Sequence, residues 1–184
     1  MQIIELPPLE YLLKCFRYDP KTGRLFWMWR PLSHFKSESD CRRWNSTYAG
    51  REAGAVSSQG YRVMSIDSVH VRVSRVIWKI ISGDDPAGQI DHANRDTGNH
   101  RPNNLRDATP GQNGSNRKVG CNNTSGFKGV TWRKNRERWV VNIRHAKKNV
   151  FVGMFKDKAE AALAYNNKAL ELHGSFALLN EFSA

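Results

Sequence analysis

The segment that most limits how this chain can fold lies between residues 84 and 116. Asn, Asp, Gly, His and Pro dominate it, and Ile90, Leu105 and Ala108 are its few apolar anchors. Propensity alone predicts a loop over these residues. A compact domain rarely holds so long a segment without regular structure unless that segment is functional. Something other than apolar packing must therefore organise it, and a bound metal ion is one candidate.

Composition excludes several classes of protein. The 184 residues, 39% hydrophobic and 25% charged, fit one ordinary domain or two small ones. No stretch approaches the roughly 20 apolar residues of a membrane helix, and the N-terminus, with Glu5, does not have the pattern of a signal peptide. Cys15, Cys41 and Cys121 form no C-x-x-C pair, which argues against a disulfide scaffold and a cysteine-bound zinc. We expect a protein of the reducing cytoplasm with no membrane partner.

Local patterns before the polar segment predict a series of short elements. Apolar spacing and alternation favour a helix over 9–16, a strand over 24–29, and a hairpin of 60–66 and 69–73. A helix over 75–81 should follow, with Ser74 as its N-cap and Gly83 at its end. Residues 34–48 are polar with no clear period, and we predict a loop there.

The C-terminal third has a clearer pattern. We predict three short strands, then a helix that begins at a capping box of Asp157 and Glu160 and reaches about Leu172. The strands are expected at 129–133, 138–144 and 149–155. Three antiparallel strands and one helix make a small, self-consistent module.

Positive charge is concentrated in this part of the chain. Lys and Arg number 29 against 17 Asp and Glu, a formal net charge of +12. Between residues 117 and 156, Glu137 is the only acid, and aromatic residues interleave with the basic ones. Disordered basic tails lack such aromatics. The pattern therefore indicates a folded sheet with one cationic face.

The polar segment carries Asp91-His92, Asn104 and Asn113 in that order. This arrangement resembles the HNH (ββα-metal, His-Me finger) endonucleases, particularly the homing-type enzymes of phages and mobile introns. The resemblance covers most of residues 9–117: a Tyr-Asp-Pro-x-Thr-Gly turn, a Trp-bearing strand, a Gly-Tyr-Arg strand, an amphipathic helix, then Ile-Asp-His and Asn-Leu-Arg. It implies an α+β chain whose residues 1–117 form a ββα-metal nuclease core.

The resemblance also implies a role for each of the four polar residues. Asp91 and Asn113 would hold the metal, His92 would be the general base, and Asn104 would orient His92 and brace the loop between two β segments. The residue types suit this chemistry. Histidine titrates near neutrality, and the hard oxygens of a carboxylate and an amide suit Mg²⁺, with Mn²⁺ as a substitute.

Two positions depart from the family pattern. Ser74 stands where many relatives carry a His, just before the Arg of the helix, and His100 stands where they often have Asn. If the first His is needed for activity, Ser74 lowers that activity. His100 is close enough in sequence to be a neighbour of the site. Taken alone, an Asp-His pair in a loop is usually ordinary polar surface, and turn asparagines usually serve backbone geometry; the assignment rests on the whole set.

Residues 125–180 resemble the Apetala-2/ethylene-response-factor DNA-binding domain. The matching stretches are Gly-Phe-Lys-Gly-Val, Arg-Trp-Val-Val-Asn-Ile-Arg, Val-Gly-Met-Phe and Ala-Glu-Ala-Ala-Leu-Ala-Tyr-Asn, ending in Leu179-Asn180. The resemblance implies a domain over 125–184, joined by a linker at 118–124, whose three-stranded antiparallel sheet enters the major groove with a helix behind it. Thr131 stands where the family often has a second Arg, so base readout should differ there.

A sheet face suits DNA recognition because alternate side chains project together and a ribbon fits the major groove. Arg can contact guanine with two hydrogen bonds, whereas Lys mainly meets phosphate. An idle basic surface, with Trp132 and Trp139 as core, is the alternative. Carried over by position, the DNA-facing set would be Arg133, Arg138, Trp139, Arg144 and Lys148, with Lys128, Lys134 and Phe151 near it.

Together these features predict a sequence-recognising DNA endonuclease of homing or mobile-element type. It would hydrolyse a phosphodiester of double-stranded DNA with one divalent metal, in a bacterial or phage-infected cell. A monomer with one site would nick one strand, whereas a double-strand break would need a DNA-bound dimer or two successive cuts. No protein partner is evident from the sequence.

Two other functions fit part of the pattern. A non-catalytic DNA-binding regulator with a decayed nuclease core explains the same charge, and Ser74 favours it, whereas the intact set of Asp91, His92, Asn104 and Asn113 argues against it. An RNA binder is the weaker alternative. Readers of single-stranded RNA usually stack bases on exposed aromatic side chains.

Overall fold

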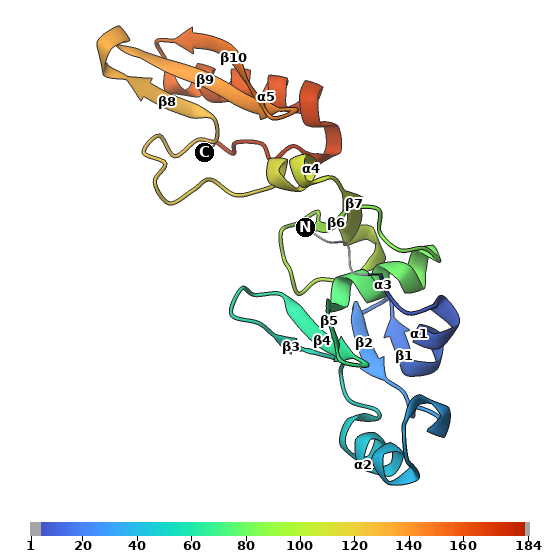
Figure 1. Ribbon diagram of the computed structural model, residues 1–184. Helices are drawn as coiled ribbons and strands as arrows, with labels where there is room; N and C mark the ends of the chain where they lie inside the picture. The colour runs from blue at the N-terminus through green and yellow to red at the C-terminus, as the bar shows by residue number, and fades with distance from the viewer. Residues whose placement is uncertain (1–4, 183–184) are drawn as a thin grey trace. The chain divides into compact units, whose positions relative to one another are not determined.

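The computed structural model describes residues 5–182, and the chain forms two compact units, Met1–Asp107 and Ala108–Ala184 (Figure 1). The first unit runs from blue to green in Figure 1, and the second from yellow to red. The boundary falls before residue 117, the predicted end of the nuclease domain, so residues 108–124 belong to the second unit. The described helices include none that is long and apolar enough to cross a membrane.

The first unit begins with helix α1, Leu9–Cys15, which buries Leu12 and Cys15 as its apolar spacing predicts. An antiparallel pair follows, β1 (Phe16–Asp19) and β2 (Arg24–Trp27). The tight turn between them depends on Asp19, because its carboxylate accepts hydrogen bonds from Lys21 N at 3.0 Å and Thr22 Oγ1 at 2.8 Å. The predicted helix and strand are confirmed, and β1 is an additional strand.

A three-stranded sheet comes next, in the order β3 (Ala55–Val56), β4 (Arg62–Ile66) and β5 (Val69–Arg72). Asp67 and Ser68 join β4 to β5 with φ values of 48° and 71°, which is the backbone of a two-residue hairpin turn. The predicted hairpin is confirmed.

Helix α3 spans Val73–Ser82 and ends at Gly83, whose φ of 90° is left-handed as expected. The prediction that Ser74 caps this helix is wrong. Arg72 is the N-cap residue, no side chain caps the helix, and Ser74 is buried within its first turn. The chain enters the helix directly from β5 because Val73 is fully buried in the core.

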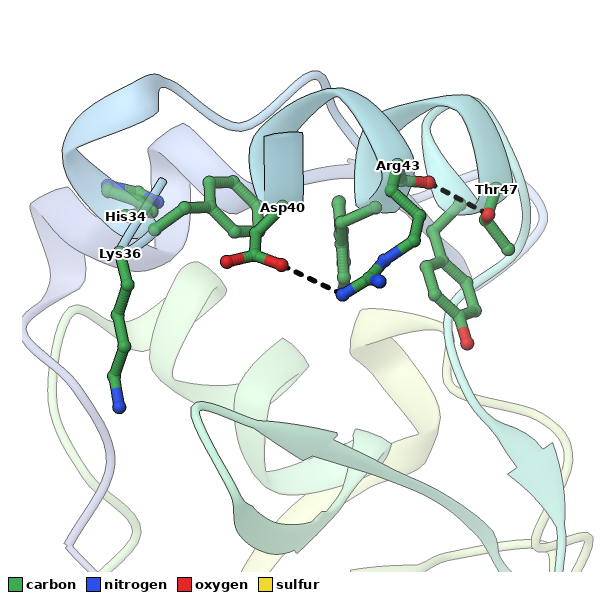
Figure 2. Close-up of a pocket in the computed structure, with 8 residues that line it drawn as sticks. His34, Lys36, Asp40, Arg43 and Thr47 are labelled. Atoms are coloured by element: carbon green, nitrogen blue, oxygen red, sulfur yellow. Dashed lines mark hydrogen bonds and ion pairs between the residues drawn. The ribbon is translucent and has the colours of Figure 1, made fainter. Parts of the chain in front are cut away.

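Residues 34–48 are not the predicted loop, because Glu38–Tyr48 form helix α2. Ser37 caps it by accepting a hydrogen bond from Asp40 N at 3.1 Å. Arg43 pairs with Asp40, and Thr47 Oγ1 donates to the Arg43 carbonyl (Figure 2). The inner face of α2 is aromatic and polar, which hides its period: Trp44 packs edge-on against Trp27 at 4.9 Å between ring centroids.

Buried Asn45 on α2 fixes the neighbouring segment. Its Oδ1 accepts from Arg30 N at 2.8 Å, and its Nδ2 donates to Arg30 O at 2.9 Å. The buried guanidinium of Arg30 then donates to Asp67 Oδ1 at 2.8 Å and lies over the rings of Phe35 and Trp44. A short 3₁₀ turn, η1 (Leu32–His34), lies between β2 and α2.

The polar segment is not a loop throughout. It contains β6 (Gln89–His92), the 3₁₀ turn η2 (Pro102–Asn104), β7 (Leu105–Ala108), paired with β6, and helix α4 (Pro110–Ser115). Ile90 and Leu105 join the apolar core of the first unit. This core also takes residues from α1, β2, β4, β5 and α3: Leu12, Leu25, Met64, Ile66, Val71, Val76 and Ile77.

The second unit contains the predicted three strands and helix. The strands β8 (Val130–Arg133), β9 (Arg138–His145) and β10 (Lys148–Phe155) form an antiparallel sheet in the order β10-β9-β8. Helix α5, Lys158–His173, is capped by Asp157 as predicted. Its small and aromatic residues pack on the sheet in one cluster that includes Val130, Val141, Ile143, Ala161, Ala162 and Tyr165. Short 3₁₀ turns, η3 (Lys134–Arg136) and η4 (Gly174–Phe176), follow β8 and α5.

Asn180 closes this unit at its C-terminal end. Its Oδ1 accepts from Lys128 N at 2.6 Å, and its Nδ2 donates to Lys128 O at 3.1 Å. The side chain of buried Asn166 on α5 bonds to the backbone N and O of Asn180. The Leu-Asn pair that ends the motif thus ties the segment before β8 to the helix.

Candidate nuclease site and DNA-binding face

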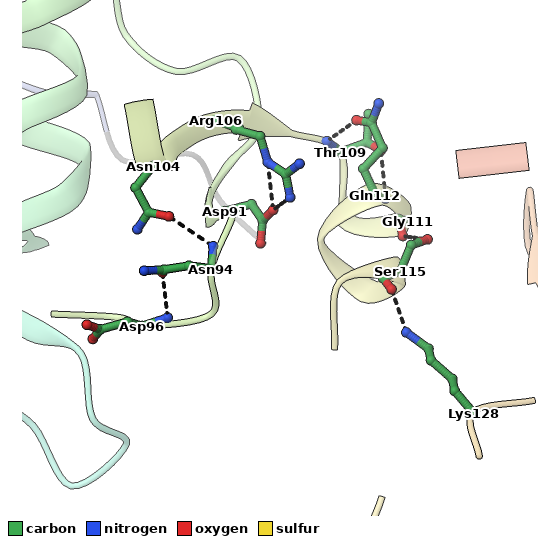
Figure 3. A network of polar contacts seen from close by, with 10 residues as sticks. All are labelled: Asp91, Asn94, Asp96, Asn104, Arg106, Thr109, Gly111, Gln112, Ser115 and Lys128. Atoms are coloured by element: carbon green, nitrogen blue, oxygen red, sulfur yellow. Dashed lines mark hydrogen bonds and ion pairs between the residues drawn. The ribbon is translucent and has the colours of Figure 1, made fainter. Parts of the chain in front are cut away.

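The loop between β6 and β7 is held closed by Asn104. Its Oδ1 accepts from Asn94 N at 2.9 Å (Figure 3). Its Nδ2 donates to Asn99 O at 2.7 Å. Its backbone carbonyl also accepts from Ala93 N at 2.8 Å. Two ends of one loop are therefore tied to a single buried side chain. These contacts support the bracing role that we predict for Asn104.

Asp91, the predicted metal ligand on β6, is 4% exposed and forms an ion pair with Arg106 on β7. Arg106 Nε donates to Asp91 Oδ2 at 3.1 Å, and its Nη2 donates to the same oxygen (Figure 3). A buried carboxylate needs such a partner, because desolvation of an unpaired charge is costly. The sequence contains Arg106 within the Asn-Leu-Arg motif, but we predict no role for it there. Arg106 follows Leu105 on the strand paired with β6, and this position was the signal that could have revealed its ion pair with Asp91.

His92, the predicted general base, is also 4% exposed. Burial lowers its pKa from 6.5 to about 4, and the nearby ring of His100 adds to the effect. The two imidazole centroids are 5.3 Å apart. Burial also lowers the pKa of His100. His92 is therefore a neutral imidazole at pH 7, which is the form that can accept a proton.

The turn between β1 and β2 supports the segment that carries His100. Tyr18 Oη donates to His100 O at 2.7 Å, and Arg101 Nε donates to Lys21 O at 2.8 Å. A Cβ atom on Gly23, whose φ is +76°, would lie 2.8 Å from Arg101 N and 2.9 Å from His100 C. The Tyr-Asp-Pro-x-Thr-Gly turn thus fixes the backbone of His100, a function that sequence reasoning did not predict.

Asn113, the second predicted ligand, lies in α4. Thr109 and Gln112 form a capping box at the start of this helix: Thr109 Oγ1 accepts from Gln112 N at 3.2 Å, and Gln112 Oε1 accepts from Thr109 N at 2.8 Å. The structure brings Asp91, His92, His100 and Asn104 together in the first unit, whereas Asn113 belongs to the second. The pairing of Asp91 with Asn113 stays a prediction.

We predict oxygen ligands for a metal ion at this site, rather than a cluster of ionisable side chains. Within residues 5–182, no group of three or more His, Cys, Asp or Glu side chains is arranged to hold a metal. The expected pair, one carboxylate and one amide, would not form such a group, and its hard oxygens suit Mg²⁺ with water and phosphate completing the shell. The three cysteines are free thiols, two of them buried.

The strand register of the second unit shows on which side of the sheet each predicted DNA-facing residue lies. Arg133 pairs with Arg138, and Phe151 pairs with Asn142. Alternation along β9 places Arg138, Asn142 and Arg144 on one side of the sheet. This side, which we call the outer face, is turned away from α5. It carries Arg133, Arg138, Arg144 and Phe151 of the predicted set.

The other four predicted residues lie elsewhere. Trp139 is on the opposite side, partly buried against the α5 core, and its ring faces the Lys158 ammonium of α5. Lys148 pairs with His145, which shares the side of Trp139. Lys128 Nζ donates to the carbonyls of Ser115 and Arg117, and so satisfies the C-terminal end of α4. Lys134 lies in η3, beside Arg133.

Hollows of the first unit lie beside α2. One of about 490 Å³ is lined by His34, Phe35, Lys36, Asp40, Arg43, Trp44, Thr47 and Tyr48 (Figure 2). Its mixed charge and the internal pairing of Asp40 with Arg43 give it no marked preference for a ligand. None of the predicted site residues lines it.

Parts of the chain are similar to known proteins. The family of HNH endonucleases matches residues 71–115, which contain β6, η2, β7 and α4. The ethylene-responsive transcription factor ERF024 of Arabidopsis thaliana is 43% identical over 56 residues, which are 29% of this chain and 30% of that protein. Protein 3.8 of Escherichia phage T7 is 36% identical over 103 residues, which are 55% of this chain and 84% of that protein. The chain belongs to the family of phage T7 Protein 3.8, and its residues 71–115 are an HNH endonuclease domain.

Proposed function

We propose that this protein is an Mg²⁺-dependent DNA endonuclease of the homing or mobile-element type. The observation that carries the proposal is the pair Asp91 and His92, which are adjacent, buried and on β6 of the HNH-matched segment. The pair supplies a carboxylate and a neutral imidazole from successive residues of one strand. In metal-assisted phosphodiester hydrolysis such groups hold the ion and accept a proton. The protein would act in the cytoplasm of a bacterial or phage-infected cell.

His92 would take the proton from the attacking water. The lowered pKa of about 4 keeps the imidazole unprotonated, although it also makes the residue a weak base while no substrate is bound. A phosphate brought near the ring would raise this pKa, because negative charge favours the protonated form. The site would thus gain basicity when the DNA backbone arrives. Asn104 and the β1–β2 turn would keep the ring in place through the loop and His100.

The carboxylate of Asp91 and the amide oxygen of Asn113 would hold the divalent ion, with Mn²⁺ as a substitute for Mg²⁺. When bound, the ion supplies Lewis acidity and positive charge at the leaving oxygen. Arg106 already places a positive charge at Asp91. The guanidinium is suited to contact a phosphate oxygen once the carboxylate is shared with a cation. A monomer would nick one strand, and a double-strand break would need a second site.

The second unit would bind duplex DNA. Two observations support this: 56 residues of the chain are similar to the ethylene-responsive factor, and the outer face carries Arg133, Arg138 and Arg144. An Apetala-2-like domain of this kind would lie with its sheet in the major groove. It would extend the footprint of a small nuclease and give it sequence preference.

The second candidate is a DNA-binding regulator whose nuclease core has decayed. Ser74, buried in α3 in place of the usual His, favours it. So does the ion pair that occupies Asp91. The intact Asp91, His92 and Asn104 favour the enzyme.

Conversion of supercoiled plasmid by the full chain separates the two candidates. The enzyme should produce nicked or linear plasmid with Mg²⁺ or Mn²⁺, and none in EDTA. The regulator should retard the plasmid in a gel without scission under any divalent ion. Asp91→Ala should abolish cutting and keep DNA binding, because the outer face is untouched. Metal-independent cutting, or full activity of Asp91→Ala, would contradict the proposal.

A further inference from the structure

The outer face of the second unit holds a hollow that is lined by apolar and polar side chains. The hollow, of about 370 Å³, is lined by Arg133, Asn135, Arg136, Val140, Phe151 and Met154. Phe151 is 58% exposed and Met154 is 43% exposed, whereas Val140 at the base is 8% exposed. A surface that met only phosphates would gain nothing from an exposed aromatic ring and thioether. An apolar group of a bound nucleic acid would remove these side chains from water.

A β-bulge builds this hollow. Phe151 pairs with Asn142 and Met154 pairs with Val140, with a register shift between Phe151 and Gly153. In a regular strand, residues three apart point to opposite sides of the sheet. The extra residue at the bulge instead turns Met154 to the side of Phe151. Arg136 Nη1 lies 3.4 Å from Met154 Sδ, which fixes the rim on that side.

We propose that this hollow receives the 5-methyl group of a thymine in the major groove of duplex DNA. The proposal rests on the proposed DNA binding of the outer face. In the major groove the thymine methyl is the apolar group that marks one base from the others. Arg133 lines the hollow, and its strand partner Arg138 lies on the same face, so phosphate and base-edge contacts are available around it.

The shape of the hollow favours double-stranded DNA over single-stranded DNA. A single strand would stack a base flat on one aromatic ring. Here Phe151 and Met154 from β10 and Val140 from β9 line one hollow, which favours contact on several sides of a small group. The flanking arginines favour the paired guanine edges of a duplex.

The test compares two DNAs that differ only in the methyl groups. A duplex is selected from a random pool for binding to the full chain in EDTA, and is then amplified with thymidine or deoxyuridine triphosphate. Fluorescence anisotropy gives a Kd for each form. The uracil form should bind roughly fourfold more weakly for each methyl that the protein buries.

Substitutions show whether Phe151 causes the difference between the two Kd values. Phe151→Ala should bring the ratio of the two Kd values close to one, and Phe151→Leu should keep most of it, because leucine preserves an apolar wall. Leu170→Ala, at an exposed position on α5, is the matched control and should keep the wild-type ratio. Because Phe151 is largely exposed, its loss should leave the far-UV circular dichroism and the Tm nearly unchanged.

The other possible results would contradict either this inference or the proposed function. Equal Kd values for the two duplexes would overturn this inference and leave the proposed function standing. A ratio that persists in Phe151→Ala would assign it to DNA flexibility and also overturn the inference. Tighter binding of the single strand would replace the methyl site by base stacking. No duplex binding at all would overturn the proposed function itself.

Discussion

Arg106 and Asp91 face each other across the paired strands β7 and β6, and both guanidinium contacts go to one carboxylate oxygen, Oδ2. The pair is largely buried, which makes each charge dependent on the other. A cation bound at Asp91 would share this carboxylate with Arg106. The relationship links the stability of the nuclease unit to the chemistry that we propose for it.

Arg106→Ala should destabilise the protein by about 3 kcal/mol in EDTA, because it leaves a buried carboxylate without its partner. Mg²⁺ should then stabilise the variant more than the wild type, since the cation no longer competes with a guanidinium. Urea unfolding with and without Mg²⁺ measures both effects. Arg24→Ala is the matched control, because Arg24 pairs with Glu52 at 3.9 Å on the surface. Its cost should stay below about 1 kcal/mol, and an equal Mg²⁺ effect in all three proteins would contradict a cation site at Asp91.

Gly23→Ala tests whether the β1–β2 turn supports the site. A new Cβ would meet the backbone of His100 and Arg101 below 3.0 Å, in addition to the strain of a left-handed alanine. Gly50→Ala has the same kind of φ, +80°, with no atom within 4 Å of its Cβ, so it should cost only the conformational term of about 1 to 2 kcal/mol. We expect Gly23→Ala to cost more than Gly50→Ala and to lower plasmid cutting. Equal costs in thermal melts would show that the close approach does not matter.

The protein should lose stability as the pH falls through the range between about 6.5 and 4. His92 has a folded pKa of about 4 against 6.5 for the free side chain, so below pH 6.5 the unfolded chain binds the proton first. The loss from this residue should reach about 3 kcal/mol at pH 4, and none should appear above pH 7. His92→Gln, measured by urea unfolding in EDTA, should remove this part of the slope. An unchanged slope in that variant would contradict the buried neutral imidazole.

Lys128→Ala should affect folding, whereas Lys134→Ala should affect DNA binding. Lys128→Ala removes the ammonium that satisfies two carbonyls at the end of α4, so it should lower the free energy of unfolding by about 1 to 3 kcal/mol. Lys134→Ala alters an exposed side chain beside Arg133 and should leave stability unchanged, while it weakens binding to all sequences and flattens the salt dependence. Anisotropy titrations at several salt concentrations and urea unfolding test both variants. The reverse pattern would place Lys128 on the DNA surface instead.

Sequence reasoning predicted the elements whose burial follows a simple period. The strands at 130–133, 138–145 and 148–155 and the helices α1, α3 and α5 have apolar faces of the expected spacing. The helix α2 was missed because its buried face combines Trp44, Cys41 and Asn45, which no hydropathy period reveals. Ser37, three residues before Asp40, was the capping signal that could have revealed it.

The structure of the polar segment at the candidate site could not be predicted from hydropathy periods either. Its strands are short and anchored by Ile90 and Leu105, and its loop is held by hydrogen bonds of Asn104 rather than by apolar burial. Such order depends on partners far apart in the sequence, so propensity cannot predict it. The residue types at the site could be predicted from a family resemblance. Only the structure revealed the ion pair between Arg106 and Asp91 and the support of the site by the β1–β2 turn.

The most direct test of the central claim is the rate of plasmid nicking by His92→Ala beside His70→Ala, each in Mg²⁺ and in EDTA. His70 is an exposed histidine on β5 of the same unit and serves as the matched control. We expect the wild type and His70→Ala to nick at the same rate in Mg²⁺, and His92→Ala to be at least a hundredfold slower while it still binds DNA. Undiminished nicking by His92→Ala, or nicking that persists in EDTA, would contradict the account.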